Sequence, residues 1–222
     1  MNSVTNSSTR RSFLKQAGII STGLPVLSFL TTNELNTDPA DDNINIIGPK
    51  SGYSPQIGTL VSMMTWMRAT VLRSVKNMNQ ADLDFLFDSN SNTIGALLMH
   101  LAATEAWYQL NTFQELSDNK FPADFDKKWM GASDLGEEAR KQIKGNDLKY
   151  YIDIMTETRE ATLAEFKKRD DAWLMKIDKE GFDDLPTNNY CKWFHVCEHE
   201  SNHNGQIKWY AKRIPGRKNG AG

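Results

Sequence analysis

The chain has 222 residues, of which 39% are hydrophobic and 24% are charged. This length allows one domain with a full hydrophobic core and is too short for two large domains. The formal net charge of −2 argues against a nucleic-acid-binding protein, because such proteins concentrate basic residues on one face.

The first 30 residues have the features of an export signal. Arg10 and Arg11 precede Phe13, Leu14 and Lys15, and an apolar stretch follows over residues 17–30. This stretch is too short and too rich in glycine and serine for a transmembrane span. The order Arg-Arg-x-Phe-Leu-Lys resembles a twin-arginine signal, and a disordered basic tail is the alternative.

The resemblance to that signal implies an exported protein of the periplasm or cell envelope, with no stable membrane span expected after processing. Proteins on this route fold before they cross the membrane, and loading of a metal beforehand is a common reason. Residues 31–53 are polar and rich in Asn and Asp, which is typical of a linker. The expected organisation is a signal segment (1–30), a linker (31–53), a helical domain (54–214) and a tail (215–222).

Apolar residues recur every three or four positions in four long segments, which predicts four amphipathic helices. These segments are residues 57–78, 93–115, 147–168 and 189–213. We expect residues 116–145 to be a long connection with one short helix near 136–144, and residues 169–188 to be a loop. No segment shows the alternation of a strand. The sequence therefore predicts an all-α fold, an up-down four-helix bundle with one long connection.

Three of the four histidines, His195, His199 and His203, lie four residues apart in the last predicted helix. Residues at this spacing share a helix face, so two imidazoles can converge on one ion. His195 and His203 are about 12 Å apart along the axis and cannot share an ion. Either the His195/His199 pair or the His199/His203 pair can therefore supply two ligands to one metal ion.

The fourth histidine, His100, lies on an apolar face of the second predicted helix and should point into the bundle. Imidazoles from two helices, with coordination positions left open, form a catalytic type of metal site rather than a closed structural one. The alternative is a set of core histidines satisfied by hydrogen bonds. Cys191 and Cys197 are six residues apart, about 9 Å along a helix, so we expect two free thiols or one inert pair and no disulfide framework. Neither is placed by helical phase and distance to be a metal ligand.

The sequence LLMHLAATEAWY in the second predicted helix, with HESNHNGQI near the C-terminus, resembles the DinB/YfiT-like superfamily of metal-binding four-helix bundles. The specific part is His-x-x-x-His followed by x-Gly-Gln-Ile. In that family a divalent ion, commonly zinc or nickel, is held by one histidine of the second helix and both histidines of the motif. The resemblance implies that His100, His199 and His203 are the ligands.

Two further residues belong to the candidate site. His195 is one turn from the implied ligands, where it either donates a hydrogen bond in a cavity or is simply packed. Gln206 shares the ligand face and either orients a ligand or is a polar residue at the end of the bundle.

Glu198 and Glu200 flank the histidines, so no clear general base is predicted. Other residues have expected structural roles: Glu105 as a surface or interhelical charge, and Trp107, Tyr108, Trp193 and Trp209 in core packing.

The resemblance implies a metal-dependent enzyme that acts on a small molecule. Characterised relatives resemble thiol-dependent S-transferases, and hydrolysis is the other chemistry that such an ion supports. The export signal favours the hydrolase-like alternative, because small thiols are expected to be scarce outside the cytoplasm. A non-catalytic metal-binding or interaction module, in which the ion only braces the bundle, and a bundle without metal remain as alternatives. Relatives are often dimers, which suggests a homodimer.

Overall fold

The computed structural model describes residues 43–117, 120–129 and 131–217. The expected signal segment lies outside the described residues, so export stays a prediction, and so does the homodimer. Within the described part of the chain, no helix is both long enough and apolar enough to cross a membrane.

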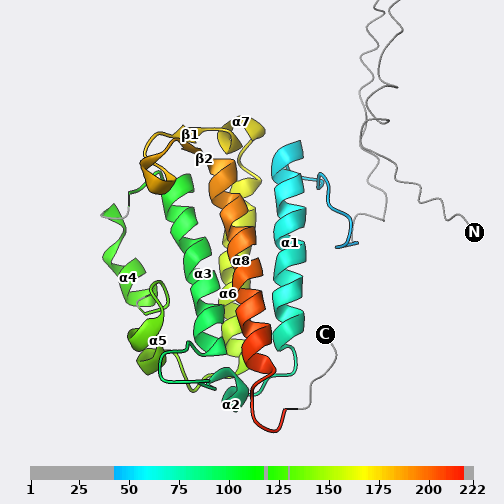
Figure 1. Cartoon of the computed structure of the whole chain (residues 1–222). Coiled ribbons are helices and arrows are strands. Elements are labelled where there is room, and N and C mark those ends of the chain that lie inside the picture. The colour runs from blue at the N-terminus through cyan, green and yellow to red at the C-terminus, as the bar shows by residue number, and fades with distance from the viewer. Residues whose placement is uncertain (1–42, 118–119, 130, 218–222) are drawn as a thin grey trace, which may run out of the picture. The chain divides into compact units, whose positions relative to one another are not determined.

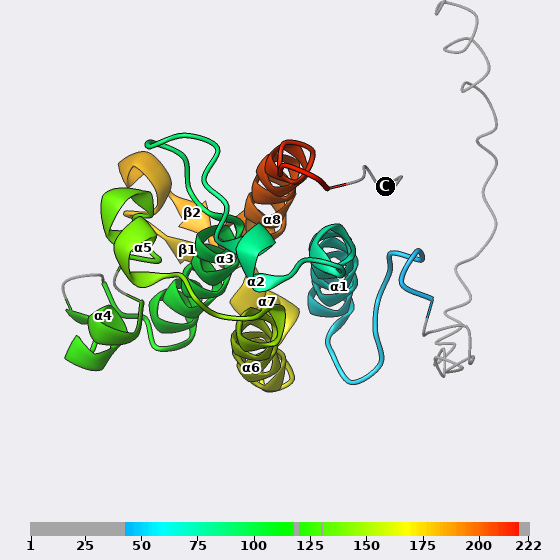
Figure 2. The same ribbon diagram turned by 90° about the horizontal axis from the view of Figure 1, so that it is seen from below.

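Four long helices form a bundle (Figure 1). They are α1 (Pro55–Val75), α3 (Ile94–Tyr108), α6 (Leu148–Phe166) and α8 (Asn189–Ala211). Seen along the bundle, α8 packs between α1 and α3, and α6 closes the ring by packing on α3 and α1 (Figure 2). The all-α bundle that the sequence predicts is confirmed.

The long connection joins two parallel helices. Gly95 and Tyr151 lie near the first turns of α3 and α6, and a Cβ added to Gly95 would lie 2.6 Å from the Tyr151 hydroxyl. Only glycine allows this approach, which brings the two helix starts together. The connection must therefore return along the bundle, so that α3 and α6 run in the same direction. The predicted up-down alternation does not hold between these two helices.

The connections contain more structure than their sequences suggest. The long one carries two short helices, α4 (Ala123–Trp129) and α5 (Gly136–Gln142), where one was predicted. A further short helix, α2 (Gln80–Leu83), follows α1. Trp129 is buried, which explains why α4 is held against the bundle although it is only seven residues long.

Residues 169–188, predicted as a loop, contain four short elements: α7 (Asp171–Leu174), β1 (Ile177–Asp178), η5 (Phe182–Asp184) and β2 (Thr187–Asn188). The two strands pair antiparallel, Ile177 with Asn188 and Asp178 with Thr187. The prediction of no strand was wrong here, because two-residue strands are too short to show an alternating pattern. This hairpin leads directly into α8.

The end of α3 widens into a π-helical turn, η3 (Gln109–Phe113). The Gln109 side chain donates hydrogen bonds to the Thr158 carbonyl at 2.8 Å and to the Thr162 hydroxyl at 2.9 Å on α6. A π-helical turn inserts one residue into a helix and changes the direction of the side chains that follow. Here it sets the direction of Asn111, which faces α8.

One charged side chain from each long helix enters the centre of the bundle. Arg68 donates to Glu105 at 2.8 Å and to Glu200 at 2.8 Å. Arg159 donates to the same two carboxylates at 2.7 and 2.9 Å. All four residues are at most 8% exposed. Glu105 is thus an interhelical charge, one of the two roles expected for it, and it is fully buried.

The guanidinium groups also donate to main-chain carbonyls, which anchors the cluster to the helices. Arg68 reaches the Met155 carbonyl at 2.9 Å, and Arg159 reaches the Met64 carbonyl at 3.0 Å. Burial raises the pKa of Glu105, but the positive charges of Arg159 and Arg68 outweigh this effect, and the pKa is lowered overall. The carboxylate is therefore ionised in the folded protein at neutral pH.

Candidate metal centre

His100 is placed by α3, the most buried of the long helices. Thr93 caps this helix by accepting a hydrogen bond from the Ala96 amide. Small and apolar residues surround His100 on the helix, and most of them are buried in the core. The imidazole is only partly buried and faces α8.

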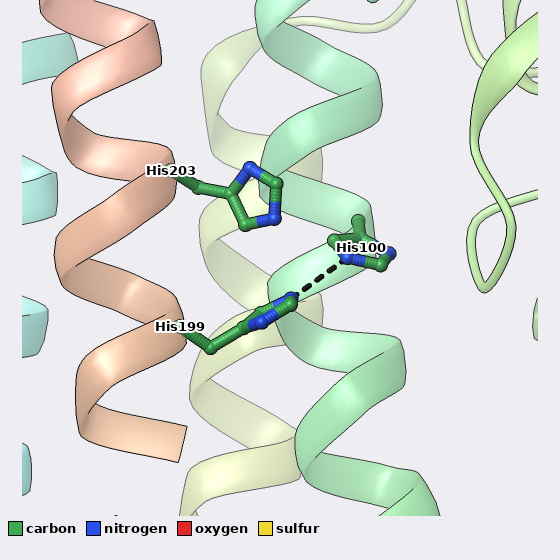
Figure 3. A group of neighbouring side chains, drawn as sticks. All are labelled: His100, His199 and His203. Atoms are coloured by element: carbon green, nitrogen blue, oxygen red, sulfur yellow. Dashed lines mark hydrogen bonds between the residues drawn. The ribbon is translucent and has the colours of Figure 1, made fainter. Parts of the chain in front are cut away.

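His199 and His203 are placed by α8, which Asn188 caps by accepting from the Cys191 amide at 2.8 Å. The two imidazoles are one helical turn apart, with ring centroids separated by 4.6 Å. They point from α8 towards His100 on α3, and the three rings face one another (Figure 3). The three histidines therefore meet in space although 99 residues separate the first two in the sequence.

The distances fit a single ion. One ring nitrogen from each of the three histidines lies within 4.8 Å of the others, and the Nε2 atoms of His100 and His199 are 2.8 Å apart. Two nitrogens bound to one ion at about 2.0–2.1 Å are about 2.9 Å apart when they subtend a right angle. Small rotations of the rings therefore bring the nitrogens to bonding positions, and the cluster can hold a metal ion.

Hydrogen bonds fix the orientation of two of the rings. His100 Nδ1 lies 2.7 Å from the Ala132 carbonyl oxygen, and His203 Nδ1 lies 3.2 Å from Gln206 Oε1. Both partners are acceptors, so Nδ1 carries the proton and Nε2 presents its lone pair to the centre. Ligand histidines in metalloproteins are oriented in the same way. Gln206 therefore has the orienting contact that was one of its two expected roles.

Burial lowers the pKa of all three imidazoles. For His199 the pKa falls to about 3, because burial disfavours the charged form and the neighbouring His100, His203 and His195 repel a further proton. Neutral imidazole is the form that binds metal. The site is thus prepared for a cation at neutral pH.

The lowered pKa values predict that the metal-free protein loses stability in acid. Because the folded-state pKa of His199 is about 3, against an ordinary 6.5, the unfolded chain takes up the proton first. This contribution to the free energy of unfolding is complete above pH 6.5 and is lost progressively as the pH falls towards 3. Thermal denaturation of chelator-treated protein between pH 7 and pH 4 should show a falling Tm, and this His199 contribution should be absent in His199→Ala.

His195 does not join the cluster and has a different partner. Its Nδ1 lies 2.9 Å from the Tyr108 hydroxyl, and its ring lies 5.1 Å from that of His199 between centroids. Burial, as the main cause, raises the pKa of Tyr108, so the phenol keeps its proton and donates it to Nδ1. When Nδ1 accepts from Tyr108, the ring proton is on Nε2. The side chain is 37% exposed. Whether His195 donates a hydrogen bond in a cavity or is simply packed stays a prediction.

Phe182 connects His195 to a cavity whose lining includes none of the four histidines. The Phe182 ring lies 5.5 Å from that of His195 and 6.4 Å from that of Tyr108, between centroids. Phe182 also lines a cavity of about 680 Å³, and so does Trp107. The predicted core role is correct for Trp193 and Tyr108, which are buried, and it is wrong for Trp209, which is 42% exposed. Trp107 packs against the core and also lines the cavity. Helical periodicity gives the face of a residue but does not show whether a neighbour covers it.

Glu198 Oε2 lies 3.8 Å from His195 Nε2, but the acidic residues that the structure describes do not join the metal-binding histidines. Among the described residues, no carboxylate joins the three-histidine cluster. Glu200, next to His199 in sequence, faces the bundle axis and pairs with the two arginines, and Glu198 is on the surface. Cys191 and Cys197 are free thiols, as expected, and burial raises the pKa of Cys197 to about 12.

Sequence reasoning missed the contacts made by the connecting segments. The Ala132 carbonyl that orients His100 comes from the turn between α4 and α5, and a backbone acceptor has no signature in the sequence. It also missed Lys192, which is buried at the cavity and bonded to Asn111 and Asp178. A lysine one turn before His195 and seven residues before His199 was the signal that could have found it.

The fold and the three-histidine cluster agree with the comparison to protein families. The family model described as Mycothiol-S-transferase matches residues 59–212, which include α3, α6, α8 and nearly all of α1. A search of curated proteins found no match. Because the match covers more than half of the chain and all three histidines, the protein belongs to the mycothiol S-transferase family of DinB/YfiT-like four-helix bundles.

Proposed function

We propose that this protein is a metal-dependent S-transferase that joins a low-molecular-weight thiol to an electrophilic small molecule. His100, His199 and His203 would hold the ion, with zinc or nickel as the preferred candidates for an all-imidazole site. The observation that carries the proposal is the convergence of three neutral imidazoles, two of them with Nδ1 bonded to an oxygen acceptor. Family membership favours a thiol over water as the nucleophile.

When bound, the ion would supply the charge that lowers the pKa of a thiol and keeps it as thiolate at neutral pH. The residues around it have separate tasks. The bonds from His100 to the Ala132 carbonyl and from His203 to Gln206 keep Nε2 deprotonated and directed inward. Tyr108 holds His195 with its proton on Nε2, as a donor for a negative charge developing at the substrate.

This assignment differs from the hydrolase-like chemistry that the export signal favoured. Hydrolysis is assisted by a carboxylate that accepts a proton from water; Glu198 pairs with His195, and among the described residues no carboxylate joins the three-histidine cluster itself. A thiol that is already ionised needs no such base. The arrangement of residues therefore suits thiol transfer better than hydrolysis.

The test is a thiol-conjugation assay with an aryl chloride. The thiol loses its proton, the carbon–sulfur bond forms and chloride leaves, so the absorbance of the thioether measures the rate. We expect the metal-loaded protein to accelerate conjugation with at least one thiol of a panel that includes mycothiol. Chelator should remove the acceleration, and zinc or nickel should restore it. Metal-loaded protein that accelerates no thiol, but hydrolyses an ester or amide, would contradict the proposal.

A further inference from the structure

The turn between α4 and α5 supplies the acceptor that orients His100. The carbonyl oxygen of Ala132, a buried residue, lies 2.7 Å from His100 Nδ1. Two main-chain hydrogen bonds close the turn. The Ala132 amide donates to the Trp129 carbonyl at 2.9 Å, and the Leu135 amide donates to the Gly131 carbonyl at 3.0 Å. The direction of the His100 ring therefore depends on where this turn is held.

The backbone of the turn is strained at Leu135. Its φ of 60° and ψ of −147° lie in a region that residues with a Cβ rarely adopt, and such a conformation persists only where the surroundings fix it. The Leu135 side chain packs against the core, and the next amide, that of Gly136, is bonded to a side chain outside the turn. Contacts with the rest of the protein therefore hold the turn in place.

The side chain bonded to Gly136 is that of Asn92, which immediately precedes the cap of α3. Asn92 Oδ1 accepts from the Gly136 amide at 2.9 Å. Arg140 of α5 reinforces this junction, because its Nη1 donates to the main-chain carbonyls of Asn90 and Ser91, each at 3.3 Å. The segment between α2 and α3 thus lies against α5 (Figure 2). The residues that lead into α3 therefore hold the turn that orients a histidine of the same helix.

We propose that Asn92 is a positioning residue of the metal centre. Through the Gly136 amide it fixes the turn, so that the Ala132 carbonyl stays at His100 Nδ1 and Nε2 presents its lone pair to the other two histidines. Without this bond the turn relaxes at Leu135, and the carbonyl no longer has a fixed position. The proposal rests on the metal-binding part of the proposed function.

The first measurement uses the full chain without metal, so that it does not depend on whether an ion binds. Nitrogen-15 NMR of the imidazoles at pH 7 distinguishes a ring with its proton on Nδ1 from one with its proton on Nε2, and the spectrum of His100→Ala identifies the signals of His100. We expect the proton on Nδ1 in the wild type and a mixture of both forms in Asn92→Ala, because the hydrogen bond at one nitrogen sets the proton position. Asn92→Asp keeps an oxygen that can accept from Gly136 and should restore the wild-type spectrum.

The second measurement is the zinc affinity of the same variants, obtained by competition with a chromophoric chelator. The dissociation constant should be about tenfold higher in Asn92→Ala, the lower end of the effect of losing a direct partner of a metal ligand, because Asn92 acts through the turn. Asn92→Asp should bind zinc as the wild type does. A wild type that binds no zinc would count against the proposed function, and the NMR result would still decide the role of Asn92.

The matched control is Asn146→Ala. Asn146 also immediately precedes a helix cap, that of α6, and its side chain donates to the Lys144 carbonyl. This variant should leave the proton position and the zinc affinity unchanged. Asn92→Ser, whose side chain is shorter, should repeat both changes if Asn92→Ala does not fold.

Four results would overturn the proposal. They are a wild-type His100 with its proton on Nε2, a proton that stays on Nδ1 in folded Asn92→Ala, equal zinc dissociation constants in the wild type and Asn92→Ala, and the same changes in Asn146→Ala.

Discussion

Replacing His199 with alanine is expected to lower the metal content of the protein from about one ion per chain to nearly none. His199 is one of three nearly equidistant ligands, because its ring lies 4.8 Å from that of His100 and 4.6 Å from that of His203, and these two rings are 4.9 Å apart between centroids. Loss of a hydrogen-bond partner that only orients a metal ligand weakens metal affinity by about 10–100-fold. Loss of a ligand itself should therefore weaken metal affinity by more than about 100-fold. Conjugation activity should fall in parallel. The measurement is elemental analysis of untagged protein, because a histidine tag would itself bind metal.

The control variants distinguish histidines that bind the metal from nearby residues of α8 that do not. His195→Ala should keep the metal, because His195 is bonded to Tyr108 and lies outside the cluster. Lys208→Ala, at an exposed position of α8, should keep both metal and activity. Full metal content in His203→Ala, with loss in His195→Ala, would show that the other histidine pair of α8 is the binding pair.

Replacing Glu105 with glutamine is expected to destabilise the fold by about 3–5 kcal/mol, because it leaves two buried guanidinium groups with one carboxylate between them. Glu105 is fully buried and accepts from Arg68 and Arg159, which come from α1 and α6. The measurement is the free energy of unfolding in urea on chelator-treated protein, so that metal loss does not contribute.

Glu160 is the matched control on the surface of α6. Glu160→Gln should change the free energy of unfolding by less than about 0.5 kcal/mol, as is usual for exposed positions. A loss below about 1 kcal/mol in Glu105→Gln would show that solvent reaches the cluster and screens it. The role assigned here is structural: the cluster links all four long helices and so fixes the position of α8 relative to α3.

The fold and the histidine cluster were predictable because both follow from local spacing. A repeat of three and four residues gives a helix with an apolar face, and histidines four apart give a stripe on one face. The position of His100 on the second long helix, together with the family motif, then identified which histidines meet, and the geometry brings these three together.

The remaining features depend on how helices are aligned with one another, which local spacing does not determine. Glu105 and Glu200 meet Arg68 and Arg159 only because of the relative height of four helices. Connecting segments supply the other contacts: the Ala132 carbonyl orients His100, and Asp178 in a two-residue strand holds Lys192. Predicting such contacts requires knowledge of the three-dimensional path of the long connection and of the hairpin.

The central claim is that three imidazoles, from α3 and α8, bind one divalent ion. X-ray absorption spectroscopy of untagged, metal-loaded protein tests it most directly. The predicted spectrum has three imidazole nitrogens at about 2.0–2.1 Å, reduced to two in His100→Ala. A first shell that contains sulfur, or that is unchanged in His100→Ala, would contradict the claim.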